Sequence, residues 1–113
     1  MSDRQLDVYV DWDAKQRERI KTLITDELIE EHGRKPLGQH SDALERVLQY
    51  FRRQPGEGKY IIVATKAWGE YRIGVLTGER GLVPEILDDA TFATEEEAMH
   101  GIFLRRVADL RGA

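Results

Sequence analysis

The fold is decided by one stretch of the chain, residues 59–76, which reads Lys59-Tyr60-Ile61-Ile62-Val63-Ala64-Thr65-Lys66-Ala67-Trp68-Gly69-Glu70-Tyr71-Arg72-Ile73-Gly74-Val75-Leu76. Its two ends, residues 59–65 and 71–76, are rich in β-branched and aromatic side chains, a composition typical of strands. The residues between them contain a glycine and have the length of a hairpin loop. Because parallel pairing needs a long crossover, strands joined this closely pair antiparallel. Residues 59–76 therefore predict an antiparallel hairpin.

A third short strand is predicted near Leu82 to Leu87, after a turn that contains two glycines. Pro84 lies inside this segment, and a proline has no N–H to donate to a sheet ladder. We therefore expect the third strand, where it forms, at an edge of the sheet.

Three helices are predicted around these strands. Apolar side chains recur at helical spacing from about Asp13 to Glu31, from the cap Ser41 to Pro55, and after Thr94. The expected buried stripes are Ile20, Leu23, Ile24 and Leu28, then Leu44, Val47, Leu48 and Phe51, and finally Met99, Ile102, Phe103, Val107 and Leu110. Thr94 and Glu97 have the spacing of a capping box, in which Glu97 reaches back to the Thr94 N–H. The order α-α-β-β-(β)-α predicts an α+β fold, with three helices packed on a small antiparallel two- to three-stranded sheet.

Length and composition set limits on function. The chain of 113 residues is expected to form a single domain, residues 1–113. Its net charge of −4 argues against a nucleic-acid binder, and the absence of cysteine excludes disulfides, thiolate metal sites and a cysteine nucleophile. No apolar run approaches the ~20 residues of a membrane span, and the first ten residues lack the apolar core of a signal peptide. We expect a cytoplasmic protein that binds neither nucleic acid nor membrane.

The sequence offers no self-sufficient catalytic or metal site. His32, His40 and His100 are 8 and 60 residues apart, so no two of them lie one helical turn from each other. His40 and Ser41 are neighbours, which does not place them in a relay, and Ser41 is needed as a helix cap. The adjacent carboxylates Asp88 and Asp89 fit a turn better than an acid–base pair. We predict no catalytic, cofactor-binding or metal-binding residue in this chain.

Aromatic side chains give the remaining functional signal. Trp12 precedes the first predicted helix, and Trp68 lies at the tip of the predicted hairpin beside Tyr71 and Arg72. Tryptophan, tyrosine and arginine are the residues most enriched at the energetic centres of protein interfaces. We therefore predict a partner interface that uses these four residues. A second basic and aromatic run, Tyr50-Phe51-Arg52-Arg53, fits a solvated rim beside the core stripe.

Several segments are similar to one known family. They are Glu31-His32 through Pro36 and Gly38, Arg46-Val47, Tyr50-Phe51-Arg52, Gln54-Pro55, Gly58-Lys59-Tyr60, Trp68, Tyr71-Arg72-Ile73, Phe92 through His100, and Phe103-Leu104. In these the chain resembles the small (alpha) subunit family of bacterial N,N-dimethylformamidase. The resemblance covers roughly residues 12 to 111 in collinear order, and Phe92 through His100 is its most specific part.

The resemblance implies a role in amide hydrolysis. Enzymes of this family hydrolyse N,N-dimethylformamide to dimethylamine and formate, with a mononuclear iron held in the large subunit by two tyrosines and a glutamate. The small subunit contributes no recognised catalytic residue. The chain is then expected to be a non-catalytic subunit that stabilises a large catalytic partner, with no cofactor of its own.

Two other interpretations stay open at this point. The chain is alternatively an independent interaction module, or a homodimer, that uses the Trp68 hairpin for another partner. It is otherwise a small stand-alone enzyme that relies on Asp88, Asp89 or His100. Co-purification with a large subunit separates the first interpretation from these two.

Overall fold

The computed structural model describes residues 3–53, 59–66, 69–76, 83–87 and 89–112, with the backbone alone over residues 3–11. Across these ranges the chain forms four helices and three strands. In chain order they are α1 (Asp3–Leu23), α2 (Asp26–Arg34), α3 (Asp42–Arg52), β1 (Tyr60–Lys66), β2 (Glu70–Val75), β3 (Glu85–Ile86) and α4 (Glu95–Gly112). The predicted α+β class is confirmed.

The predicted hairpin is confirmed and forms the larger part of the sheet. β1 and β2 pair antiparallel with Ile62 opposite Ile73, and β3 pairs antiparallel with β2 to give the order β1-β2-β3. β3 thus lies at an edge, as Pro84 predicts. Gly69 enters β2 with a φ of 142°, a conformation that side chains with a Cβ rarely adopt.

The prediction of one helix from Asp13 to Glu31 is wrong. Helix α1 begins at Asp3 and ends at Leu23, and α2 begins at Asp26. Between them Thr25 has extended backbone, and its hydroxyl accepts a hydrogen bond of 3.2 Å from the Leu28 N–H, so that it caps α2. Ile24 and Leu28, on either side of Thr25, are both buried. The apolar stripe continues through the break, and for this reason periodicity does not reveal it.

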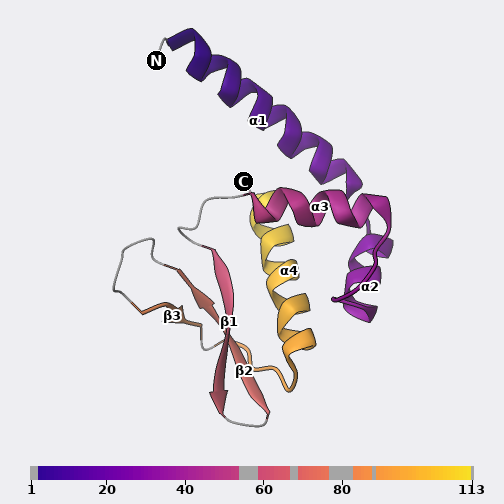
Figure 1. Ribbon diagram of the computed structural model, residues 1–113, viewed down its shortest axis with the longest axis vertical. Helices are drawn as coiled ribbons and strands as arrows, with labels where there is room; N and C mark the ends of the chain where they lie inside the picture. Colours follow the sequence, from indigo (N-terminus) through magenta and orange to yellow (C-terminus); the bar gives the residue numbers. More distant parts are fainter. Residues whose placement is uncertain (1–2, 54–58, 67–68, 77–82, 88, 113) are drawn as a thin grey trace.

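Helix α4 is the central layer of the molecule. It lies between the sheet on one side and the other helices on the other side (Figure 1). Ile73 of β2 is 1% exposed, and its side chain reaches the α4 backbone at Gly101. The expectation that the helices pack on one face of the sheet therefore holds for α4. Helices α2 and α3 pack against the side of α4 that faces away from the sheet.

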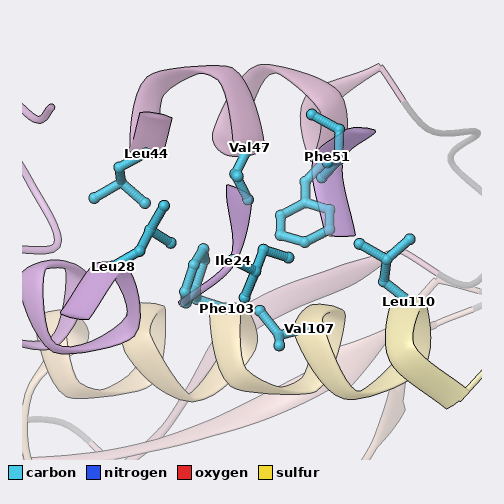
Figure 2. Close-up of a cluster of buried hydrophobic side chains, with 9 residues drawn as sticks. Ile24, Leu28, Leu44, Val47, Phe51, Phe103, Val107 and Leu110 are labelled. Atoms are coloured by element: carbon cyan, nitrogen blue, oxygen red, sulfur yellow. The ribbon is translucent and has the colours of Figure 1, made fainter. Parts of the chain in front are cut away.

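The hydrophobic core fills the space between α4 and the first three helices. Figure 2 shows Val47 and Phe51 of α3 pointing toward Val107 and Leu110 of α4, with Ile24 between them. The buried cluster consists of Ile20, Ile24, Leu28, Leu44, Val47, Phe51, Phe103, Val107 and Leu110. Most of the predicted stripes are therefore confirmed.

The predictions for helix α4 need two corrections. Met99, predicted as buried, is only half-buried, and Ala98 is fully buried instead. Thr94 accepts from the Glu97 N–H at 3.1 Å as predicted, but the Glu97 carboxylate accepts from the Ala93 N–H rather than from that of Thr94. The cap therefore reaches one residue further back than the capping-box pattern predicts.

None of the helices in the described ranges is long and apolar enough to cross a membrane.

Candidate functional site

A groove of about 600 Å³ lies between helices α1 and α3, and we call it the α1–α3 groove. The two helices are close at the end of α1 and diverge toward its beginning, which projects away from the rest of the molecule (Figure 1). Ile20 is buried at the floor of the groove, whereas Trp12 on its wall is 52% exposed. The groove therefore leaves a large aromatic side chain half in water.

The α1–α3 groove is positively charged on a chain that is negatively charged. Arg19 of α1, Arg46 of α3 and Arg53 after α3 line it, and Asp13 is the acidic residue among the lining side chains. All three arginines are exposed. Within the described part of the chain, no hydrogen bond or ion pair engages their guanidinium groups. The net charge of the whole chain is −4, so this surface differs in sign from the rest.

The predicted partner interface does not come together as one surface. Trp12 lies within α1 instead of before a helix, and α1 is at the opposite end of the molecule from the β1–β2 hairpin (Figure 1). Trp68 lies outside the described residues. Tyr71 and Arg72 are consecutive in β2, so their side chains point to opposite faces of the sheet. Tyr71 shares its face with Ile73, which packs on α4, whereas Arg72 is on the outer face, with Glu70 3.9 Å away.

His40, His100 and Phe103 all lie against the ring of His32. The His32 ring stacks on Phe103 with ring centroids 4.1 Å apart, and its Nδ1 is 2.9 Å from Nδ1 of His100. The His40 ring also stacks on His32, with ring centroids 6.2 Å apart. A contact as short as the one between the two Nδ1 atoms requires one ring to donate and the other to accept.

Burial makes His32 difficult to protonate. The residue is 4% exposed, and this loss of hydration, with the nearby rings of His100 and His40, lowers its pKa to about 4. Burial also lowers the pKa of His100. Both rings are therefore neutral at pH 7, as a single hydrogen bond between them requires. His100 is thus part of the packing between α2 and α4.

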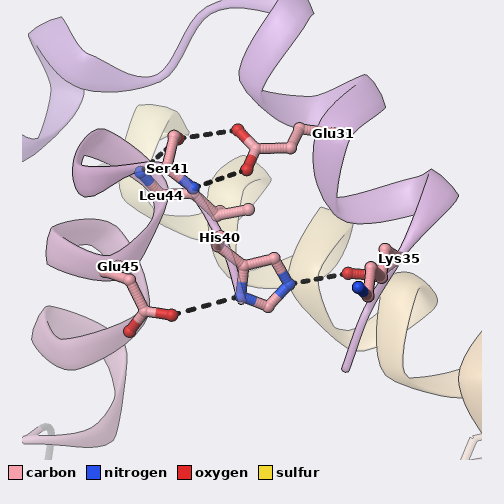
Figure 3. A network of polar contacts seen from close by, with 6 residues as sticks. All are labelled: Glu31, Lys35, His40, Ser41, Leu44 and Glu45. Carbon is pink, nitrogen blue, oxygen red and sulfur yellow. Dashed lines mark hydrogen bonds and ion pairs between the residues drawn. The ribbon is translucent and has the colours of Figure 1, made fainter. Parts of the chain in front are cut away.

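A polar network ties the end of α2 to the beginning of α3 (Figure 3). The Ser41 N–H and hydroxyl both donate to the Glu31 carboxylate at 2.7 Å, and the same hydroxyl accepts from the Leu44 N–H. These bonds lower the pKa of Glu31. His40 lies between the Lys35 carbonyl and the Glu45 carboxylate. Ser41 therefore acts as the predicted helix cap, and His40 and Ser41 have separate partners.

Asp89, another catalytic candidate, has a structural role. Asp89 receives hydrogen bonds from the Arg105 guanidinium, which lower the pKa of its carboxyl group instead of raising it as an acid–base role would require. Asp88 lies outside the described residues. Among the described residues there is no group of three or more His, Asp or Glu side chains that is suited to hold a metal ion.

Sequence reasoning placed Trp12 correctly as an exposed aromatic but missed its surroundings. Tyr50 and Arg53, which the sequence assigned to a solvated rim, line the α1–α3 groove together with Trp12. The signal was present in the basic and aromatic run at residues 50–53. The packing of α1 against α3, two helices distant in the sequence, could not be predicted from the local pattern.

Comparison with known proteins identifies the family. A family model described as the N,N-dimethylformamidase alpha subunit matches residues 7–113. The N,N-dimethylformamidase alpha subunit of Paracoccus aminophilus is 46% identical over 114 residues, which cover 96% of this chain and 79% of the relative. The protein of the same name from an Alcaligenes species is 45% identical over 114 residues, covering 96% of this chain and 85% of the relative. The chain therefore belongs to the N,N-dimethylformamidase alpha subunit family.

Proposed function

We propose that this chain is the non-catalytic small subunit of an iron-dependent amidohydrolase that converts N,N-dimethylformamide and water to dimethylamine and formate. The observation that carries the proposal is the 46% identity, over 96% of the chain, to a relative named as the alpha subunit of that enzyme. An alpha subunit is one part of a larger assembly, so a second kind of subunit is expected beside it.

The chemistry of the described residues supports a division of labour between the two subunits. The side chains that are usual in hydrolytic sites are engaged in packing and capping here: His32 and His100 bond to each other, Ser41 caps α3, and Asp89 pairs with Arg105. Iron would need several oxygen or nitrogen ligands that converge on one point. The described residues provide no such group of three or more His, Asp or Glu. We therefore assign the iron and the reacting atoms to the larger partner, and to this chain the role of stabilising it.

The test is to express the chain alone, its large partner alone, and the two together, and to measure dimethylamine release and thermal stability for each. We expect no activity from the isolated chain with or without added iron, and activity from the complex. We also expect the partner alone to melt at a lower temperature than it does in the complex. Amide hydrolysis by the isolated chain with iron would refute the proposal. A partner that is equally active and equally stable alone would refute it as well.

A further inference from the structure

We propose that the α1–α3 groove binds an acidic segment of the large partner subunit, with an apolar side chain of that segment placed against Trp12. The inference rests on the proposed function, since it names the surface through which the small subunit engages its partner. It keeps Trp12 from the interface predicted from the sequence, and it replaces the hairpin residues of that prediction with residues of α1 and α3.

Charge is the first argument for an acidic occupant. Arg19, Arg46 and Arg53 surround the groove, with Asp13 as the acidic lining residue, and none of the three guanidinium groups is neutralised by another described residue. Carboxylates are the natural partners of guanidinium groups, because the planar fork of donors matches the two carboxylate oxygens. The chain as a whole carries a net charge of −4, so an acidic segment would be repelled elsewhere and attracted here.

The aromatic wall is the second argument. Trp12 is 52% exposed although Ile20, two turns further along α1, is buried. Tyr50 of α3 lines the same groove from the other side. Tryptophan, tyrosine and arginine in one concave surface are the composition of an interface centre, where side chains of the partner exclude water from the charged pairs.

The exposure of α1 is the third argument. The first half of this helix projects beyond the rest of the molecule (Figure 1). An isolated helix of such length is marginal in water, because most helix stability in proteins comes from packing. A segment that lies in the groove contacts this part of α1 and Tyr50 together. We therefore expect the partner to hold α1 in place as it binds.

Binding of the purified chain to the large subunit, measured by titration calorimetry, tests the assignment. Trp12→Ala and Arg46→Glu should each weaken binding about tenfold or more. Arg52→Glu is the matched control for charge, because Arg52 is exposed on the same helix and does not line the groove. Leu104→Ala is the control for loss of exposed apolar surface, on α4. Both controls should bind within about threefold of wild type, and circular dichroism should show all four variants folded.

The outcomes separate the two proposals. If wild type binds and the groove variants bind equally well, the groove assignment is wrong while the proposed function stands. If Leu104→Ala or Arg52→Glu causes the loss instead, the partner binds elsewhere. If wild type and the large subunit never associate, the proposed function itself fails. If the free chain forms dimers that Trp12→Ala or Arg46→Glu dissociates, the occupant is a second copy of this chain, and the assignment to the partner is overturned.

Discussion

Lowering the pH from 7 to 5 is expected to destabilise the folded chain by about 2 kcal/mol, chiefly through His32. In the folded chain the pKa of His32 is lowered from its ordinary value of 6.5 to about 4. The unfolded chain therefore takes up a proton at His32 over a pH range in which the folded chain does not. Proton uptake by the unfolded state shifts the equilibrium toward unfolding, so stability is full above pH 6.5 and falls as the pH drops toward 4.

The magnitude follows from the difference between the two pKa values. The gap between 6.5 and about 4 corresponds to about 3 kcal/mol in total, since each pKa unit is worth roughly 1.4 kcal/mol. Roughly 2 kcal/mol of it is lost between pH 7 and pH 5. Carboxylates such as Glu31 and Asp89 also have lowered pKa values, from 4.5 and 3.8, and their contribution is lost mostly at more acidic pH. The interval from pH 7 to pH 5 therefore reports mainly on histidine.

The assay is urea denaturation followed by circular dichroism at several pH values between 7 and 5. His32→Phe serves as the comparison, since a phenyl ring can stack on Phe103 but cannot titrate. We expect most of the pH dependence to disappear in this variant, with a remainder from His100, whose pKa burial also lowers. Equal pH dependence in the two proteins would refute the reasoning. An NMR titration in which the His32 ring protonates near pH 6.5 would refute it as well.

The other predictions concern stability, measured by urea or thermal denaturation. Ser41→Ala removes the cap of α3 and the partner of Glu31, and should cost about 1–2 kcal/mol; Ser41→Thr should restore most of that, and no loss in Ser41→Ala would contradict the capping role. Leu44→Ala empties a fully buried site and should cost about 2–5 kcal/mol, whereas Leu37→Ala, at an exposed position, should cost little; similar losses would contradict the core assignment. Gly101→Ala would place a Cβ 2.6 Å from Cζ of Phe92 and should lower the melting temperature, whereas Gly112→Ala meets nothing within 4 Å and should not; a higher melting temperature for Gly101→Ala would show that Phe92 moves freely.

Most of the fold could be predicted because the strand-forming residues, the helix caps and the proline each favour the local structure that the fold contains. The β-branched runs on either side of Gly69 form the hairpin, Ser41 caps a helix, and Pro84 leads into an edge strand. The break at Thr25 could not be predicted from periodicity, because a cap redirects the backbone without interrupting the apolar stripe. Thr25-Asp26-Glu27 does carry a cap signature, but a threonine between Ile24 and Leu28 fits a continuous helix equally well.

The candidate site was less predictable, because its parts are distant in the sequence. His32 and His100 are 68 residues apart, yet their rings share a hydrogen bond. Trp12 and Tyr50 come from two helices whose packing depends on the whole core. Residue composition singled out Trp12, Trp68, Tyr71 and Arg72 together, but alternation in β2 places Tyr71 and Arg72 on opposite faces of the sheet, and Trp12 lies on α1.

The α1–α3 groove is related to the break between α1 and α2 at Thr25. Because α1 ends at Leu23 and Thr25 caps a new helix, α1 is free to leave the direction of α2 and to pack beside α3. The end of α1 then contributes Ile20 to the core, and Ile24 joins the core directly after the helix, while the beginning of α1 extends past α3 with Trp12 half exposed. A helix that continued from Asp13 to Glu31 would follow one axis, so α1 and α2 could not take separate directions against α3 and α4. The break at Thr25 therefore lets α1 and α3 diverge, and the groove lies between them.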